Sequence, residues 1–212
     1  MCERLHRAYV AIAKTALPPM LSGVLNGERY QGPHLGWVAL TNVGHRHADG
    51  SILGYAALLP STASDEELAR HRLTLSALSA LSGPAGRPMR FRLADEPPRL
   101  TLKPSRWIGP SCVWRTATPV VWEQFPRRGR HERIIQRMCD HVGLPEPASS
   151  RYGDKTALAG AFEARRYGAR RYRGSYISHL KLTFNEPVYG PIVLGRGRYF
   201  GLGLFGPEGN AL

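Results

Sequence analysis

The sequence predicts an α+β fold with antiparallel sheets and with helices on one face. Three observations carry this prediction: paired β-prone runs joined by turn signals, two separate helical stretches, and a strand–loop–strand pattern near residue 200. With 212 residues and 42% hydrophobic content, the chain is large enough for a real core. No apolar run reaches the length of a membrane span, so a cytoplasmic protein without a membrane partner is expected.

The three cysteines support the same compartment. Cys2, Cys112 and Cys139 are far from one another and form no CxxC pair. This spacing argues against a disulfide framework or a zinc knuckle and fits a reducing environment. Neither a metal nor an organic cofactor is expected.

The first half of the chain opens with a helix and a docking segment in residues 4–25. Two β-prone runs follow at 34–43 and 51–60, and the segment GHRHADG (44–50) lies between them. Its Asp49-Gly50 pair is a turn signal, so the two runs predict a β-hairpin.

A helix is predicted after this hairpin. Ser64 and Glu67 have the spacing of a capping box, and leucines follow at roughly helical intervals until Gly83-Pro84. Residues 89–104 then suggest two short strands around an acidic turn, and residues 112–122 suggest a strand that Pro119 interrupts. The tryptophans in or beside these strands are expected in the core; they are Trp37, Trp107, Trp114 and Trp122.

A second unit begins near residue 126. Residues 127–147 predict a helix with an apolar face formed by Ile134, Ile135, Met138 and Val142. Residues 148–170 show no clean period and suggest a loop or arm. Residues 176–184 alternate as a strand, with His179, Lys181 and Thr183 on one face and Leu180, Leu182 and Phe184 on the other.

Charge is the strongest global signal. The formal net charge is +13, and all but four of the 29 basic residues are arginine. Residues 126–212 contain 15 Lys and Arg against seven Asp and Glu, so the charge is clustered. Arginine suits bidentate phosphate contacts, and a nucleic-acid partner is the first interpretation. A genome rich in G and C would also raise arginine content, but it would not explain the clustering.

The glycine run GPIVLGRGRYFGLGLFGP (190–207) contains the pattern GxGxxxGxG. A dinucleotide fingerprint needs GxGxxG before a helix, and a P-loop needs GK[ST]; neither is present. Two readings stay open. The run is a structural hairpin, or it is a loop whose main-chain N–H groups and arginines bind RNA phosphates; the residues concerned are Gly195, Arg196, Gly197, Arg198 and Gly201.

Histidines supply the candidate chemistry. His45 and His47 lie two apart in the predicted hairpin loop, where a metal site, plain surface histidines or an acid–base pair are all conceivable. A ribonuclease without metal takes a proton from a ribose 2′-OH and returns one to the leaving 5′-oxygen. His34 is a weaker candidate for this pair, and Lys181 could stabilise the developing charge on phosphorus. The histidines on helical stretches, His71 among them, are expected to be solvated.

The segment RRYGARRYR (165–173) interleaves basic and aromatic residues. This composition suits neutralisation of a phosphate backbone together with base stacking. The expected RNA contacts are Arg165, Arg166, Arg170, Arg171 and Arg173.

Three stretches, taken in order, resemble one known family. They are PHLGWVALTNVGHRHADGSILGYAALLP (33–60), WRTATPVV (114–121) and FNEPVYGPIVLGRGRYFGLGLF (184–205). Together they resemble the Cas-six-like C-terminal half of the type I-G (I-U) CRISPR Cas-five/Cas-six fusion protein. The glycine loop alone resembles the looser signature of the RAMP superfamily. The resemblance covers roughly residues 20–207.

This resemblance implies two tandem ferredoxin-like (RRM-like) modules. The expected division is an N-terminal helical segment (1–29), a first module with the His-rich hairpin (30–125) and a second module with the glycine-rich loop (126–212). No Cas-five-like half is present, so the chain is expected to be one subunit of a split pair or a fragment of a fusion. A Cas-five-like part is then among its partners.

The resemblance also implies an activity. Members of the family cut CRISPR repeat transcripts without metal by 2′-OH attack, which leaves a 2′,3′-cyclic phosphate and a 5′-hydroxyl. They then remain on the 3′ repeat hairpin within a type I effector complex. Some relatives only bind RNA, so a non-catalytic RNA-binding subunit is the alternative expectation.

Overall fold

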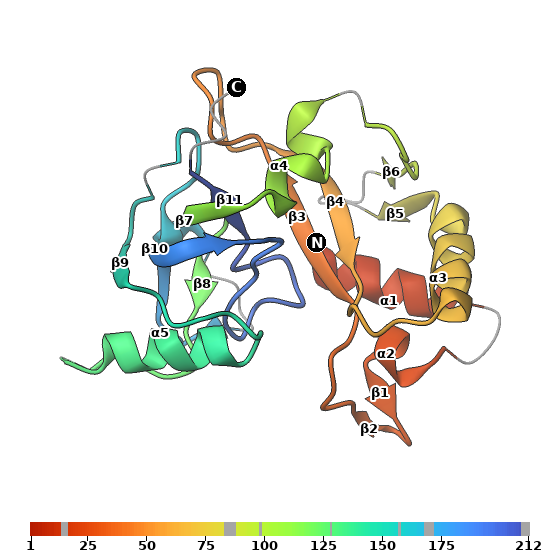
Figure 1. The fold of residues 1–212 in the computed structure, drawn as a ribbon. Coiled ribbons are helices and arrows are strands. Elements are labelled where there is room, and N and C mark those ends of the chain that lie inside the picture. The colour runs from red at the N-terminus through yellow and green to blue at the C-terminus, as the bar shows by residue number, and fades with distance from the viewer. Residues whose placement is uncertain are drawn as a thin grey trace.

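The computed structural model describes residues 1–13, 17–82, 88–97, 99–127, 129–156, 158–167 and 172–208. Helices and antiparallel sheets form two lobes, which lie side by side in Figure 1. Every strand pair in the described sheets is antiparallel. The predicted α+β class is therefore confirmed. Two tandem ferredoxin-like modules within that class stay a prediction.

The first lobe is built around the two-stranded sheet β3–β4. Its elements are α1 (Cys2–Ile12), α2 (Pro19–Ser22), β1 (Val24–Leu25), β2 (Glu28–Arg29), β3 (Gly36–Thr41), β4 (Ile52–Leu58), α3 (Asp65–Ala77), β5 (Ala80–Ser82) and β6 (Pro88–Arg90). All six residues of β3 are buried. Trp37 packs with the helix residues Leu5 and Tyr9, whereas Val38 and Leu40 pack with Trp107. Burial on both faces explains why this strand is a continuous apolar run.

The second lobe contains a larger sheet in the order β11-β7-β10-β8, with β9 also paired to β10. Its elements are β7 (Ser111–Thr116), β8 (Val120–Val121), α5 (His131–Asp140), β9 (Ser149–Gly153), β10 (Ile177–Val188) and β11 (Phe205–Pro207). Ile135 and Met138 of α5 pack against Leu180 and Leu182 of β10. The helix therefore covers one face of this sheet, and the alternate residues of β10 face the other side.

Most of the predicted elements are confirmed. The β3–β4 hairpin forms, and Ser64 closes the capping box of α3 with Glu67. The predicted alternation of β10 is present, and all four tryptophans are at most 4% exposed. Pro119 separates β7 from β8, as expected.

Three predictions about local structure are wrong. Residues 148–170 are not an irregular arm, because they contain β9 and the 3₁₀ turn η3 (Ala164–Tyr167). The second strand expected in 89–104 is instead the 3₁₀ turn η2 (Leu100–Leu102), which precedes α4 (Ser105–Ile108). The helix α3 ends at Ala77, and the leucines beyond it belong to β5 or its approach.

The expected module boundary lies between β8 and α5. Both β7 and β8 precede residue 126, yet both pair with β10. The larger sheet thus takes strands from both sides of that boundary. Among the residues that the structure describes, no helix combines the length and the apolar character needed to cross a bilayer.

Candidate functional site

The glycine loop of residues 195–203 packs against the protein itself. A Cβ on Gly195 would lie 2.4 Å from the carbonyl oxygen of Val121 in β8, and one on Gly201 would lie 2.6 Å from the Sγ of Cys2 in α1. Both glycines have positive φ, +85° and +90°, a region that disfavours other residues. Glycine is therefore required here by close approach within the fold.

Several main-chain N–H groups of this loop are also engaged by the protein. Arg196 N–H donates to Val121 O at 2.9 Å, Arg198 N–H to Gly195 O at 3.2 Å, and Phe200 N–H to Gly197 O at 2.9 Å. These donors are not available for phosphates. The structural hairpin reading accounts for Gly195, Gly197 and Gly201, all of which are buried. What the loop offers to a ligand is the exposed side chain of Arg196 and the half-buried one of Arg198.

His34 lies against this loop. Its ring stacks on Tyr199, with centroids 3.7 Å apart and planes 20° apart, and the guanidinium of Arg198 lies 4.8 Å from the centre of the same tyrosine ring. The main-chain N–H of Trp37 donates to the carbonyl of Tyr199 at 3.1 Å, which connects the start of β3 to the loop. Although His34 and Tyr199 are far apart in the sequence, the fold brings them into contact.

The tautomer of His34 follows from its one hydrogen bond. Nδ1 lies 2.9 Å from the carbonyl oxygen of Gly32, so Nδ1 carries the proton. In the neutral ring Nε2 then holds a lone pair, and no described residue bonds it. Burial lowers the pKa of His34, and the positive charge of neighbouring Arg198 adds to this effect. The ring is therefore neutral near pH 7 and able to accept a proton.

His6 is a neighbour that the sequence did not single out. Its Nε2 donates to Ser22 O at 3.0 Å, and its Nδ1 accepts from the indole N–H of Trp37 at 3.4 Å. Both nitrogens are thus used within the protein, and His6 positions α1 against β3. Tyr199 was also missed, although its place inside the glycine run could have marked it.

His45 and His47 occupy the β3–β4 loop, as predicted, but their nitrogens are largely engaged. Nε2 of His45 donates to Asn42 Oδ1 at 2.7 Å, and its Nδ1 accepts from the main-chain N–H of His47 at 3.3 Å. Nε2 of His47 accepts from Arg46 Nε at 2.7 Å. Asp49 anchors the loop through Asn42 and Ser51, whose hydrogen bonds lower the pKa of Asp49 to about 2.

These two histidine sites are separate. His34 precedes the first residue of β3, whereas His45 follows its last residue. Six strand residues rise about 20 Å, so the ring of His34 and the hairpin pair do not form one catalytic centre. The structure therefore does not unite the three candidate histidines.

His179 and Lys181 lie together on the face of β10 opposite α5. His179 is only 2% exposed; Nε2 donates to Phe162 O at 2.8 Å, and Nδ1 accepts from the Thr116 hydroxyl at 2.8 Å. Burial lowers the pKa of His179, so this imidazole is a neutral, fully bonded core group. Lys181 remains half-buried and lines a pocket of about 240 Å³.

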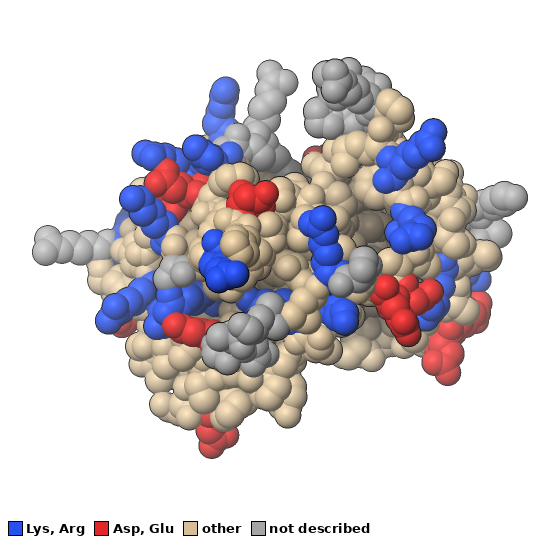
Figure 2. Space-filling view, turned by 90° about the horizontal axis from the view of Figure 1, so that it is seen from above, with Lys and Arg blue, Asp and Glu red and all other residues tan. Residues whose placement is uncertain are grey.

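The basic and aromatic segment is only partly described. Arg165 pairs with Glu163 at 2.5 Å, and Arg166 lies 5.3 Å from the ring centre of Phe162. Arg173 is exposed, whereas Arg170 and Arg171 lie outside the described residues. Figure 2 shows that Lys and Arg side chains spread across one face of the molecule, with Asp and Glu among them.

Comparison with protein families gives one result. The model of the CRISPR-associated protein, GSU0054 family (Cas_GSU0054) matches residues 2–207. The chain belongs to this family. A search of curated proteins and a search of solved structures each gave no match. A role of this CRISPR-associated chain in CRISPR defence follows from the match.

The described part of this member of the GSU0054 family offers no cluster of metal ligands. Within the described ranges, no group of three or more His, Cys, Asp or Glu side chains is placed to hold a metal ion. Cys2 and Cys139 are buried, and burial raises their pKa values to about 11 and about 12, so neither is a ready thiolate ligand.

Proposed function

We propose that this CRISPR-associated chain is a metal-independent endoribonuclease that processes CRISPR repeat transcripts into guide RNA. The family match supports a place in the CRISPR system. The resemblance to the Cas-six-like half of the type I-G (I-U) fusion protein, in the RAMP superfamily, supports the reaction. The observation that carries the proposal is His34: a neutral imidazole with an Nε2 that no described residue bonds, stacked on the tyrosine ring that Arg198 also contacts.

The chemistry needs few groups. Nε2 of His34 takes the proton from the ribose 2′-OH, and the resulting oxygen attacks the adjacent phosphorus. As the bond between phosphorus and the 5′-oxygen breaks, the leaving oxygen takes a proton from water and departs as a hydroxyl, and a 2′,3′-cyclic phosphate remains. Arg198, beside the same tyrosine ring, stabilises the charge that develops on the phosphate oxygens, and Arg196, two residues earlier in the loop, is exposed.

Within this proposal, the assignment of the catalytic base changes in favour of His34. His45 and His47 are retained as the competing pair, but three of their four ring nitrogens already have partners in the protein. Lys181 is proposed to bind phosphate rather than to act beside His34. The stem of the repeat is proposed to contact the predicted arginines: Arg165, Arg166, Arg170, Arg171 and Arg173.

The test compares two sets of histidine variants on labelled repeat RNA. His34→Asn keeps a side-chain N–H for the Gly32 carbonyl but removes the base, so we expect cleavage to fall about 10²–10⁴-fold with binding changed only a few fold. His45→Ala with His47→Ala should leave cleavage within a few fold. If the double variant loses cleavage while His34→Asn cuts RNA normally, the catalytic centre lies in the hairpin loop instead. EDTA should not reduce cleavage; loss of activity in EDTA would contradict the metal-independent mechanism.

A second candidate function is a non-catalytic RNA-binding subunit of a type I effector complex. It is favoured by the pocket that Lys181 lines. This pocket is basic, but His179, the one histidine among the described residues that line it, is fully hydrogen-bonded within the protein. The same incubation separates the two functions: repeat RNA that is bound without any cyclic-phosphate product supports the binding subunit.

The modular organisation and the partners are also proposals. We propose two ferredoxin-like modules, with the boundary moved to the segment before β7, because β7 and β8 pair with β10. We further propose that a Cas-five-like subunit and the guide RNA's 3′ hairpin are bound in the effector complex. Copurification of the chain with these components would test this assignment.

A further inference from the structure

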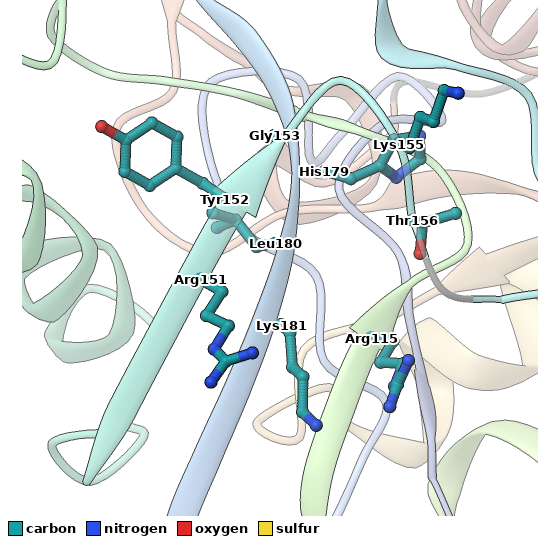
Figure 3. Close-up of a pocket in the computed structure, with 9 residues that line it drawn as sticks. All are labelled: Arg115, Arg151, Tyr152, Gly153, Lys155, Thr156, His179, Leu180 and Lys181. Carbon is teal, nitrogen blue, oxygen red and sulfur yellow. The ribbon is translucent and has the colours of Figure 1, made fainter.

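Three basic side chains lie side by side on the larger sheet, on the face opposite α5. Lys181 of β10 pairs in register with Arg115 of β7 and with Arg151 of β9. Figure 3 shows their side chains pointing the same way, each from a different strand. Neighbouring strands are about 4.8 Å apart, so this basic row of Arg115, Lys181 and Arg151 is about 10 Å long.

Two adjoining pockets lie along the basic row. The first, of about 240 Å³, is lined by all three cations together with Lys155 and Thr156. The second, of about 180 Å³, shares Arg151 and Lys181 and is otherwise lined by the hydroxyl residues Ser149 and Thr183. No carboxylate of the described residues lines either pocket. The groove therefore offers charged donors and hydroxyls, which are the groups that bind phosphate oxygens.

The basic row favours the binding of an anion. Like charges at paired strand positions repel each other, and Glu208, just after β11, relieves this repulsion in the free protein. Its carboxylate binds Arg115 and lies 3.4 Å from Nζ of Lys181. The hydrogen bond from Arg115 holds the pKa of Glu208 below its usual value, so Glu208 is charged near pH 7.

The basic row nevertheless has positive charge and hydrogen-bond donors that Glu208 does not satisfy. Arg151 is exposed and forms no ion pair with any described residue, and Nε of Arg115 is buried without a hydrogen-bond partner. A single carboxylate at one end therefore leaves net positive charge and free donors along the groove. An unpaired buried donor such as this Nε favours a ligand that supplies further oxygens.

We propose that the basic row binds the phosphodiester backbone of RNA, and that Glu208 occupies one phosphate position until RNA displaces it. Arginine forks match phosphate oxygens, and two adjoining pockets suit successive phosphates. Tyr152, the one tyrosine beside the groove, points away from it in Figure 3, so no base stacks there and the contact is independent of sequence. This inference rests on the proposed RNA-processing function and adds a binding site distinct from that of His34.

The test measures binding of a short labelled oligouridine to the full chain over a series of salt concentrations. Glu208→Gln keeps the side-chain shape, and the main-chain bonds of residue 208 with Val113 and Ser111 do not depend on its charge. The matched control is Glu186→Gln, an exposed position on β10 without an ion pair among the described residues. We expect Glu208→Gln to bind about two- to fivefold more tightly than the control.

Salt dependence supplies a second readout. Each phosphate contact on a single strand changes the slope of log K against log salt by about 0.7. Glu208→Gln should steepen the slope by up to about this amount, whereas Arg151→Gln should flatten it by about 0.7. Equal binding by Glu208→Gln and Glu186→Gln, together with an unchanged slope in Arg151→Gln, would overturn the proposal. So would complete competition by inorganic phosphate at an equal phosphate concentration, because the row would then be a site for free phosphate.

The same protein preparations are assayed for cleavage of repeat RNA. If Glu208→Gln binds oligouridine more tightly than Glu186→Gln but the wild-type chain cuts no repeat RNA, the groove proposal stands and the nuclease function is refuted. A wild-type chain that cuts repeat RNA while the row variants bind oligouridine normally refutes the groove alone.

Discussion

Replacing Gly195 by alanine separates the two readings of the glycine loop. In the structure, a Cβ at this position would lie 2.4 Å from Val121 O and 2.7 Å from Cγ1 of Val120. Both are atoms of β8, which pairs with β10 in the larger sheet. The added methyl group therefore pushes on the main chain of a buried strand.

The expected loss of stability has three parts. An alanine at φ +85° costs about 1–2 kcal/mol. Overpacking against a main chain that cannot easily move costs about 1–3 kcal/mol. If β8 retreats, the hydrogen bond from Arg196 N–H to Val121 O weakens, which costs about 0.5–1.5 kcal/mol. Gly195→Ala should therefore lower the free energy of unfolding by about 2.5–6.5 kcal/mol.

Gly143→Ala is the matched control, because Gly143 has φ +72° with no atom within 4 Å of an added Cβ. It should lose only the conformational part, about 1–2 kcal/mol. Urea unfolding followed by tryptophan fluorescence measures both variants, and RNA binding is measured well below the unfolding midpoint. The reasoning is refuted if Gly195→Ala is as stable as Gly143→Ala and yet loses RNA binding tenfold or more. That result would assign the glycine to an RNA cradle.

Two further predictions concern stability. Burial lowers the pKa of His71 to about 4, so the unfolded chain binds the extra proton more tightly than the folded chain does. The free energy of unfolding should therefore fall by about 2–3 kcal/mol as the pH drops from about 6.5 to 4. His71→Gln should flatten this pH dependence, which urea titrations at each pH measure. An unchanged pH profile in that variant would contradict this prediction. Ser64→Ala removes the capping box of α3 and should cost about 1 kcal/mol, whereas Ser61→Ala, at an exposed position nearby, should cost almost nothing; equal costs would contradict the role of the cap.

Local signals predicted those parts of the fold that depend on neighbouring residues. The capping box of α3, the β3–β4 hairpin and the alternation of β10 are each set by residues close in the sequence, and each is present, although the turn of the hairpin loop lies at Arg46-His47 rather than at Asp49-Gly50. The strand β9 was missed because its sequence, SSRYG, has no apolar alternation. It becomes a strand through pairing with β10, in which Lys181 lies opposite Arg151.

The candidate site was harder to predict, because its contacts are long-range. No local pattern shows that His34 will stack on Tyr199 or that Glu208 will reach Lys181. His71 shows the same limit in the core. It was expected on a solvated helix face, yet it is 4% exposed, and its Nδ1 lies 2.9 Å from the hydroxyl of Tyr9 in α1. The sequence shows which residue types are present, but not which of them the fold brings into contact.

The glycine loop is held in place by contacts with three elements of the fold. It touches α1 through Gly201 and Cys2, β3 through Tyr199 and Trp37, and β8 through Gly195. These contacts lie in both lobes, so the loop joins the lobes and sets the place of His34 and Arg198 at the junction. The N–H groups of Arg196, Arg198 and Phe200 are bonded internally and are not offered to RNA, but the loop can hold an imidazole and a guanidinium in fixed positions. RNA binding and cleavage should therefore depend on the loop through these side chains, with its glycines acting on stability first.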